Sequence, residues 1–448
     1  MVKSNRDSLW WIQIGADQSA ARLLEHVRAI GYEALVFDAD PDAPGAAHAT
    51  RLMTRAPDDL TSIVEDVSAL ARSAAIAGCV TLARDADSLR AAAALRSAFD
   101  LPGIPTEGMN ALLARGSWKK SLANAGIPTP VVDILESPIE LDRFLGAHPS
   151  ALLKPATGGR GSQGVARVRI GDPRNRELFD EARSVSDSDL VRIEAFVAGE
   201  EFSVDGVIRA GRFEMLHLGR QFSMRNLRGT LPTGTAWGSP VAGTRADEDP
   251  RWAEASELGQ QIAEVLGLDD CLIGFGLMDD GETTHVIDVR PHLGRAIDRA
   301  IGFTGTDVNE LICDIAVGKR RDRALDAGAT TSGFAQRFFY ANAQGVLDQP
   351  EKHSDESGWR TIPVQRDAHT SPAEGTRLLE WDKLLGEPVE RPRSAEDRVA
   401  SLLIASTDRN AAWMRANEVD PDSLYEVREA RVEPTTTHPL WPMPPMRG

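Results

Sequence analysis

The chain contains 448 residues, of which 42% are hydrophobic and 26% are charged. This composition is ordinary for a folded globular protein and excludes wholesale disorder, and the length predicts about three domains at roughly 150 residues each. The formal net charge at pH 7 is −17, because 67 Asp and Glu residues outnumber 50 Lys and Arg residues. Because such an acidic chain lacks the cationic surface that nucleic-acid binding requires, we expect no nucleic-acid partner. An anionic ligand would need a local cationic pocket.

The cysteines and the N-terminal segment both favour a cytoplasmic protein. Cys79, Cys271 and Cys313 lie far apart, so neither a CxxC zinc site nor a secreted disulfide framework is expected. The apolar run from Leu9 is short and is interrupted by Gln13, which is typical of a first strand rather than a signal peptide. No segment reaches the roughly 18 consecutive apolar residues of a membrane span, so we expect no membrane partner.

The N-terminal part alternates between short apolar segments and amphipathic ones. Strands are expected at residues 9–14, 34–37 and 78–82, and helices at 20–30, 60–75 and 87–99. Strands that alternate with helices predict a parallel sheet with crossover helices. The sequence Leu-Pro-Gly-Ile-Pro at 101–105 closes this unit.

The remainder is less regular. Further strands are expected at 131–135, 151–154, 165–170, 273–278, 285–289 and 335–340, with a hairpin over 190–214, and helices at 108–125, 139–145, 252–266, 307–317 and 395–406. Residues 220–243 are rich in Gly and Thr with little periodicity, which predicts a loop. The Pro-rich end at 434–448 predicts an extension on the surface.

The most informative stretch is LLKPATGGRGSQGV at residues 152–165. A strand delivers Lys154 to a loop that contains Gly158, Gly159, Gly161, Ser162 and Gly164. Glycines allow the main chain to wrap phosphates with its N–H groups, and a lysine can place a point charge there. A Walker loop is excluded because its lysine follows the glycines and a helix comes next. A surface hairpin with a chance lysine explains the local pattern equally well.

The order of the motifs decides between these two interpretations. The segment VRIEAFVAGEEFSVDG at 191–206 follows the glycine-rich loop. With Lys154 and that loop before it, the sequence resembles the ATP-grasp superfamily, specifically its carboxylate–amine ligases. The resemblance covers nearly the whole chain, because further matching segments are VFDADPDAPGAA at 36–47, LANAGIPTP at 122–130 and IDVRPHLG at 287–294. The last of these segments lies where the family has Glu-x-Asn-Pro-Arg.

The resemblance implies an ATP-grasp fold that combines α/β and α+β parts. It implies an N-terminal parallel-sheet domain (1–105), a lid (106–188), a central antiparallel-sheet ATP-binding subdomain (189–330) and a C-terminal subdomain (331–448). It also implies that ATP is bound by Lys154 and the glycine-rich loop, by an adenine pocket at Glu194, Ala195 and Val197, and by Glu201 at the ribose hydroxyls.

The activity that the resemblance implies is ATP-dependent ligation of a carboxylate to an amine. ATP converts the carboxylate to an acyl phosphate, which the amine attacks, so that an amide, ADP and phosphate result. The expected partners are small-molecule substrates, among them an amino acid, in specialised or amino-acid metabolism. Mg²⁺ would bridge the phosphates. A homodimer is possible because dimers are common in the family.

The sequence departs from the family pattern before the Ala-Gly-Ile-Pro junction. Members carry an Asp-Lys pair there, whereas this chain has Ala114 and Arg115. Arg115 keeps the charge, so we expect it to contact a phosphate. Lys119 and Lys120 are alternatives one turn away, although a solvated helix face is the simpler explanation of these two lysines.

The metal motif departs further. Asp288 can replace the family's second metal-binding Glu, but the first carboxylate is expected within 275–278, where Gly276 and its neighbours are not acidic. Mg²⁺ can bind to one carboxylate plus phosphates, so loss of a ligand weakens the site without abolishing it. Asp279, Asp280 and Glu282 fit a hairpin turn better than a metal site.

Basic residues follow Asp288. Arg290, His292 and Arg295 are the candidate catalytic residues, with Arg299 nearby, and would hold a substrate anion. A basic loop neutralised by neighbouring acids is the alternative. His217 and Arg220 lie at the end of a strand; we expect them to face water, as polar residues at strand ends usually do, and the alternative is that they face the site.

Two other functions remain open. Gly276 and Arg290 are compatible with a catalytically degenerate ATP-grasp protein that binds a nucleotide or regulates without turnover. A carboxylase subunit that uses bicarbonate and a biotin carrier is less well supported, because the chain has no Met-Lys-Met attachment sequence.

Overall fold

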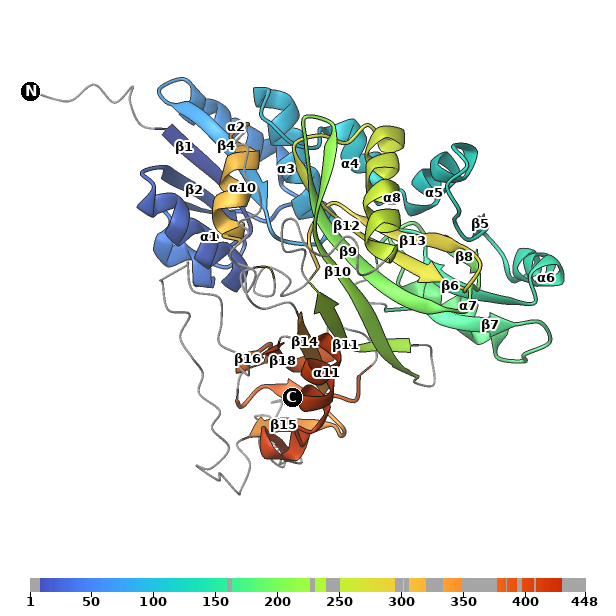
Figure 1. Cartoon of the computed structure of the whole chain (residues 1–448). Coiled ribbons are helices and arrows are strands. Elements are labelled where there is room, and N and C mark those ends of the chain that lie inside the picture. Colours follow the sequence, from blue (N-terminus) through green and yellow to red (C-terminus); the bar gives the residue numbers. More distant parts are fainter. Residues whose placement is uncertain are drawn as a thin grey trace, which may run out of the picture.

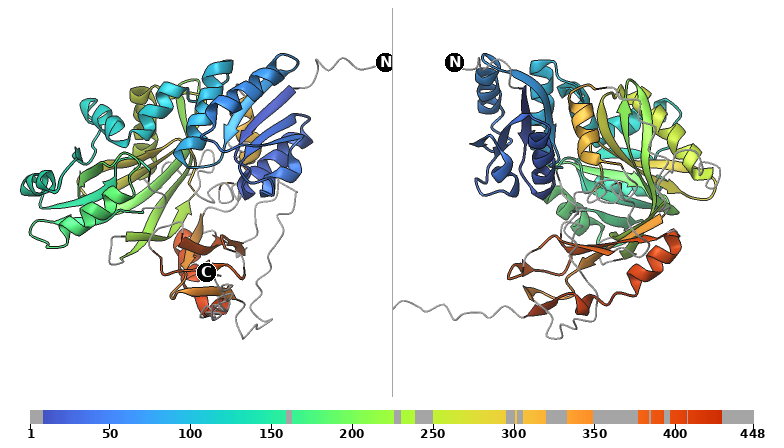
Figure 2. Two further views of the ribbon diagram at one scale, coloured as in Figure 1. Left: turned by 180° about the vertical axis from the view of Figure 1, so that it is seen from behind. Right: turned by 60° about the vertical axis from the view of Figure 1, so that its left-hand side comes forward.

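The structure is a computed structural model that describes residues 9–158, 163–225, 230–238, 250–294, 301, 306–319, 333–348, 377–383, 385–392, 397–406 and 408–428. Figures 1 and 2 show the N-terminal sheet at one end of the molecule, a second small sheet (β5–β8) at the other end, and a long antiparallel sheet between them. Within the described residues, no helix combines the length and apolarity needed to cross a membrane.

The N-terminal sheet is parallel with the strand order β3-β2-β1-β4, as the alternating pattern predicts. Its elements are β1 (Leu9–Ile14), α1 (Gln18–Ala29), β2 (Glu33–Asp38), η1 (Pro44–His48), β3 (Arg51–Thr54), α2 (Leu60–Ala71), β4 (Ala75–Thr81) and α3 (Ala86–Phe99). The helices begin where Asp17, Asp59 and Asp85 cap them by accepting a hydrogen bond from a backbone N–H three residues on. β3 was not predicted, because it is short and none of its residues is fully buried.

The second sheet is antiparallel with the order β5-β8-β6-β7. The elements of this region are α4 (Thr106–Leu113), α5 (Arg115–Asn124), β5 (Val132–Leu135), α6 (Pro138–Ala147), β6 (Ser150–Pro155), β7 (Ala166–Arg169), α7 (Asn175–Ser184) and β8 (Val191–Ala195). The single helix predicted over 108–125 is wrong, because the backbone leaves the helical region at Ala114 (ψ 69°). The boundary expected at residue 188 precedes β8, which pairs with both β5 and β6.

The central sheet has eight strands in the order β13-β12-β9-β10-β11-β14-β18-β16. They are β9 (Glu200–Arg209), β10 (Arg212–Arg225), β11 (Thr230–Gly238), β12 (Cys271–Asp279), β13 (Thr284–Arg290), β14 (Gly333–Tyr340), β16 (Arg377–Trp381) and β18 (Arg398–Ser406). The other elements are α8 (Pro250–Leu266), α10 (Val308–Ala316), α11 (Arg409–Asn417), η4 (Pro421–Ser423) and a small sheet of β15 (Gly345–Asp348), β17 (Pro388–Val389) and β19 (Glu426–Arg428).

Two predictions in this part of the chain are wrong. The expected loop at 220–243 contains the end of β10 and all of β11, which pair from Leu218–Gly238 to Arg225–Thr230. The helix expected at 395–406 is β18, a strand buried throughout. A short, continuously apolar run fits a buried strand as well as a buried helix, so periodicity could not separate them.

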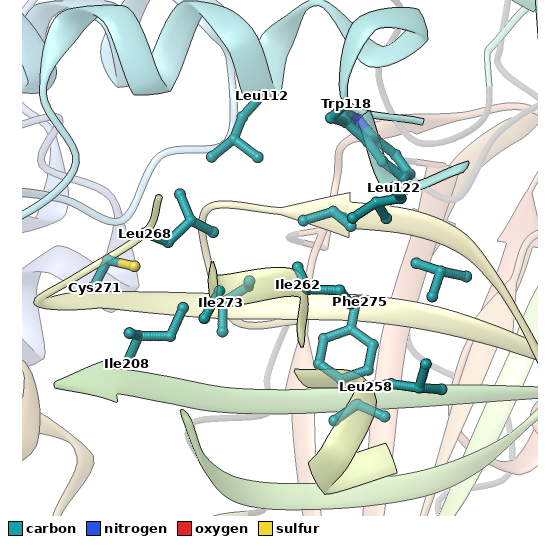
Figure 3. Close-up of a cluster of buried hydrophobic side chains, with 14 of the residues drawn as sticks. Leu112, Trp118, Leu122, Ile208, Leu258, Ile262, Leu268, Cys271, Ile273 and Phe275 are labelled. Carbon is teal, nitrogen blue, oxygen red and sulfur yellow. The ribbon is translucent and has the colours of Figure 1, made fainter. Parts of the chain in front are cut away.

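One hydrophobic core lies behind the central sheet. Figure 3 shows Trp118 and Leu122 of α5 packing with Ile262 of α8 and with Ile273 and Phe275 of β12. This core covers one face of β9 and β12, so the opposite face of these two strands is left for other contacts.

Helix α10 returns to the N-terminal sheet and packs against α1 and β4 (Figure 1). Gly78 of β4 makes this possible: a Cβ at that position would lie 2.6 Å from the carbonyl oxygen of Ala316. Val80, Leu311 and Ile312 belong to the core cluster around this contact. The N-terminal unit is therefore completed by a helix from a distant part of the chain.

Replacing Gly78 with Ala should lower the free energy of unfolding by about 1–3 kcal/mol, because the added methyl group overpacks the contact with α10. Gly146→Ala is the matched control: no heavy atom lies within 4 Å of a Cβ there, and the residue is helical, so stability should stay constant or rise by about 0.5–1 kcal/mol. Denaturant unfolding measures both. Equal stabilities of the two variants would contradict the close packing of α10 on β4.

Candidate functional site

The face of β9 and β12 that lies opposite the hydrophobic core behind the central sheet is polar. Successive strand side chains point to opposite faces, so Glu201, Ser203 and Asp205 share the face that lies away from the core. The residues paired with them on β12 are Met278, Gly276 and Gly274. Two of these three partners are glycines, which leaves room above the backbone of β12 for side chains from neighbouring strands.

A cluster of four charged side chains lies on the β5–β8 sheet and on α5. Glu194 Oε2 accepts a hydrogen bond from Lys154 Nζ at 2.6 Å and lies 2.9 Å from Lys119 Nζ. Arg192 Nε lies 3.0 Å from the other carboxylate oxygen, Glu194 Oε1. Lys154 and Arg192 are paired residues on neighbouring strands, which places them on one face with Glu194. One carboxylate thus pairs with three cations, and the cluster keeps a net positive charge.

These cations determine the protonation state of Glu194. Burial by itself raises the pKa of Glu194, but the charges of Lys154, Lys119 and Arg192 outweigh burial and hold that pKa well below its usual range. The pKa of Lys119 falls to about 8, chiefly because of burial, although Glu194 opposes the fall. At neutral pH, Glu194 is therefore ionised and Lys119 is still mostly charged.

The prediction that Lys119 lies on a solvated helix face is wrong. Its side chain is 1% exposed, and it points from α5 into the cluster, whereas Lys120 is exposed. Lys154 is 19% exposed and can meet a ligand directly. The sequence signal for this arrangement was the spacing of Arg192 and Glu194 by two residues, which puts both on one face of a strand.

A second polar cluster lies under the face of β9. Asp205 is fully buried, and its carboxylate contacts His217 Nδ1 at 3.1 Å, Ser203 Oγ at 3.3 Å and the backbone N–H of Gly294 at 2.6 Å. Burial raises the pKa of Asp205, but the hydrogen bond with His217 and the charge of Arg290 lower it overall. The expectation that His217 faces water is wrong, because this side chain is 1% exposed.

Asp288 and Arg290 lie at the edge of the same face. Asp288 of β13 is paired with Gly276, which lies in the stretch 275–278 where the first metal carboxylate was expected and which has no side chain. Arg290 Nη2 donates to Ser203 Oγ at 3.3 Å, and Arg290 Nε lies 4.0 Å from Asp288 Oδ2. A guanidinium therefore stands beside the carboxylate that was predicted to hold the metal.

These residues do not fit a metal site built by the protein. Mg²⁺ requires oxygen ligands in octahedral geometry, and here one carboxylate faces a glycine and a cation. In the part of the chain that the structure describes, no group of three or more His, Cys, Asp and Glu side chains could hold a metal ion.

His292 is present at the site but is not a cation. Its Nδ1 lies 2.8 Å from the carbonyl oxygen of Leu293. Burial, with Arg84 and Arg290 nearby, lowers the pKa of His292 to about 3. His292 is therefore neutral at neutral pH, and Arg290 carries the positive charge.

The two clusters meet at Glu201. Its pKa is raised, chiefly by burial; the charges of Lys154 and Arg290 oppose the rise, and Asp288 adds to it. Such coupling requires that the four charged groups lie near one another. The structure therefore brings together Lys154 and Glu194 of the β5–β8 sheet with Glu201, Asp288 and Arg290 of the central sheet.

The remaining predicted residues divide into three groups. Gly158 and Gly164 have positive φ values of 67° and 68°, as a tight glycine loop requires. Gly159, Gly161, Ser162, Arg295 and Arg299 lie outside the described residues, as does the side chain of Arg115, which begins α5. Ala195 and Val197 follow Glu194, and the backbone N–H groups of Ala195 and Phe196 donate to the carbonyls of Val131 and Ser150.

A small cavity elsewhere is not a candidate for a nucleotide. It has a volume of about 170 Å³ and lies between α1 and α10, lined among others by His26, Glu310 and Lys319. Ligand pockets for drug-sized molecules usually occupy roughly 300–1,000 Å³. The polar face therefore remains the candidate site.

The sequence matches no model of a known protein family and no curated protein. Solved structures do match. The L-amino acid ligase from Bacillus licheniformis superposes with a TM-score of 0.70 at 16% identity, over 95% of this chain and 99% of that one. The phosphoribosylglycinamide synthetase from Anaerococcus prevotii superposes with a TM-score of 0.63 at 12% identity, over 94% of this chain and 100% of that one.

The chain has the ATP-grasp fold. A third ATP-grasp structure that matches is the biotin carboxylase domain dimer of the Hydrogenobacter thermophilus 2-oxoglutarate carboxylase, in complex with MgADP, ADP and bicarbonate. Its TM-score is 0.64 at 14% identity, over 93% of this chain and 90% of that one. The fold expected from the order of the motifs is confirmed, and its neighbours are ligases and carboxylases.

Replacing Glu194 with Gln should lower the free energy of unfolding by about 3–5 kcal/mol at pH 7, because it leaves three buried or partly buried cations without their counter-charge. The pKa of Glu194 lies below its usual value of 4.5 in the folded protein. The carboxylate therefore stabilises the fold above about pH 4.5, and this contribution is lost as the pH falls through the folded-state pKa. The difference between wild type and variant should shrink in acid.

Denaturant unfolding at several pH values measures this difference. Glu65→Gln, which changes an exposed carboxylate on α2, is the matched control and should change stability by less than about 0.5 kcal/mol. A Glu194 variant as stable as the Glu65 control would show that the cluster does not stabilise the fold.

Proposed function

We propose that the protein binds ATP between the β5–β8 sheet and the polar face of the central sheet, and that it ligates a small-molecule carboxylate to an amine. The observation that carries the proposal is the convergence of Lys154 and Glu194 with Glu201, Asp288 and Arg290 in an ATP-grasp fold. A cationic group on an otherwise acidic protein is what a polyanionic nucleotide requires.

The adenine would lie against the end of β8, and the ribose against Glu201. Because the N–H groups of Ala195 and Phe196 are already bonded to protein carbonyls, the base would use the N–H of Val197 and the carbonyl groups of this segment. Arg167 stacks on the ring of Phe196 at 3.5 Å, which holds the segment against the sheet. A carboxylate such as Glu201 accepts two O–H donors, as a ribose supplies.

Lys154 is the proposed phosphate ligand. Its ammonium group has three donors, of which Glu194 uses one, so a phosphate can be bound without releasing Glu194. Lys119 and Arg192 are too buried to reach a ligand and instead hold Glu194 in place. Glu194 in turn positions Lys154. Arg115 and the glycine-rich loop are the other proposed phosphate ligands.

The proposed reaction has two steps. The terminal phosphoryl group of ATP passes to a carboxylate oxygen, which gives an acyl phosphate and ADP; the amine then attacks the acyl carbon, and phosphate leaves. The protein contributes positioning and neutralisation of charge rather than covalent chemistry. Arg290, and Arg295 outside the described residues, would hold the anionic groups, and His292 would line the site as a neutral side chain.

The substrates and the setting are part of the proposal. The L-amino acid ligase among the structural neighbours favours an amino-acid substrate in specialised or amino-acid metabolism. MgADP in the carboxylase neighbour favours a nucleotide that brings its own Mg²⁺. The dimer in that structure favours a homodimer. The division at residues 105, 188 and 330 and the cytoplasmic location also remain proposals.

Lys154→Ala should abolish ATP-dependent release of phosphate and ADP, because it removes the exposed ammonium group of the site. The assay is a phosphate-release screen with ATP, Mg²⁺ and paired amino acids and other acids, with products identified by mass spectrometry. Lys120→Ala, which removes an exposed lysine on α5, is the matched control and should keep wild-type turnover. A Lys154 variant that ligates normally would contradict the phosphate assignment.

Nucleotide binding without turnover is the second candidate function. The glycine at position 276 and the guanidinium of Arg290 favour it, because they weaken the metal site that ligases of this fold are expected to use. Calorimetry distinguishes the two: tight ATP binding with no ADP from any substrate pair would support the second candidate.

A further inference from the structure

We propose that Arg290 serves at this site as a built-in cation in the place of a metal ion held by protein carboxylates, and that it binds the terminal phosphate of ATP. This inference rests on the proposed function. It concerns the one position where the described residues disagree with the metal site that the fold implies.

The first argument is the room made for the side chain. Arg290 is paired with Gly274, and a Cβ at Gly274 would lie 2.9 Å from Arg290 Nη2 and 2.9 Å from Asp205 Oδ1. The guanidinium therefore lies directly on the backbone of β12 and reaches Ser203 on β9. Any larger residue at position 274 would displace it, so the glycine is part of the binding site for this side chain.

The second argument is the balance of charge. A divalent ion needs several oxygen ligands, whereas Gly276 offers none opposite Asp288. Arg290 already stands 4.0 Å from Asp288 Oδ2, and Asp205 below it lowers the cost of holding a cation there. A metal ion bound to Asp288 would be repelled by this permanent charge. The negative charge of Asp288, which a metal ion would balance, is thus already balanced by Arg290.

The third argument is the geometry of the free donors. Arg290 Nε is buried and has no hydrogen-bond partner among the described residues, and the Arg290 side chain is 25% exposed. A planar guanidinium binds phosphate through two parallel N–H groups and cannot be deprotonated in proteins. Arg290 Nη2 also reaches Ser203, which lies on the same face of β9 as Glu201 and two residues along the strand, so the guanidinium lies next to the expected ribose position. The terminal phosphates of a nucleotide would therefore meet Arg290.

The test is calorimetric titration of the full chain with ATP and with AMP, each in Mg²⁺ and in EDTA. Wild-type affinity for ATP should change less than about threefold on removal of the metal. Arg290→Gln should weaken ATP binding about tenfold or more, as expected for loss of a charge-assisted contact, and should leave AMP binding unchanged because AMP lacks the terminal phosphates. Arg290→Lys keeps the charge but lacks the planar pair of N–H groups, so its affinity for ATP should lie between those of wild type and Arg290→Gln.

Arg90→Ala is the matched control, because Arg90 is an exposed arginine on α3 that pairs only at the surface with Asp87. It should bind both nucleotides as wild type does. Equal ATP affinity of Arg290→Gln and wild type would overturn the inference. If that variant does not fold, the wild-type titrations still decide: a loss of ATP affinity above about tenfold in EDTA would overturn it.

The same titrations separate this inference from the proposed function. Binding of ATP that requires the metal would leave the proposed function standing and would refute the role of Arg290. Absence of ATP binding by the wild-type chain in either buffer would refute the proposed function and the inference together.

Discussion

The structure of the site depends on one buried carboxylate. Glu194 holds Lys154 and Arg192 on neighbouring strands and Lys119 on α5, and none of the three cations could remain in so dry a place without it. Trp118, directly before Lys119, and Leu122, one turn further on, carry α5 into the core behind the central sheet (Figure 3). Helix α5 therefore connects the two sheets, and the ionic cluster fixes one end of that connection.

The sequence was sufficient for the fold because the relevant signals are local and ordered. Lys154 ends an apolar strand, glycines follow it, and Glu194 and Glu201 flank a turn between two strands, so their order along the chain carries the architecture. The structural neighbours share only 12–16% identity, so the fold is recognised by this order of elements rather than by overall similarity of sequence.

The parts that sequence reasoning missed depend on contacts between distant residues. Ser203 and Arg290 are 87 positions apart and meet only because β12 lies between β9 and β13. Lys119 resembled a surface lysine because a helix pattern does not reveal which neighbour covers its polar side. β11 is rich in Gly and Thr, and β18 is continuously apolar, so neither shows the alternation that identifies a strand with one buried face.

The packing of α10 on β4 limits where the chain can be cut into fragments that fold. A fragment ending near residue 105 would contain every strand of the parallel sheet, yet it would lack the helix that covers Val80 and its neighbours. Such a fragment would expose an apolar surface, and the complementary fragment would carry an amphipathic helix with nothing to pack on. In the growing chain, α10 can therefore cover the parallel sheet only after about 316 residues have been synthesised.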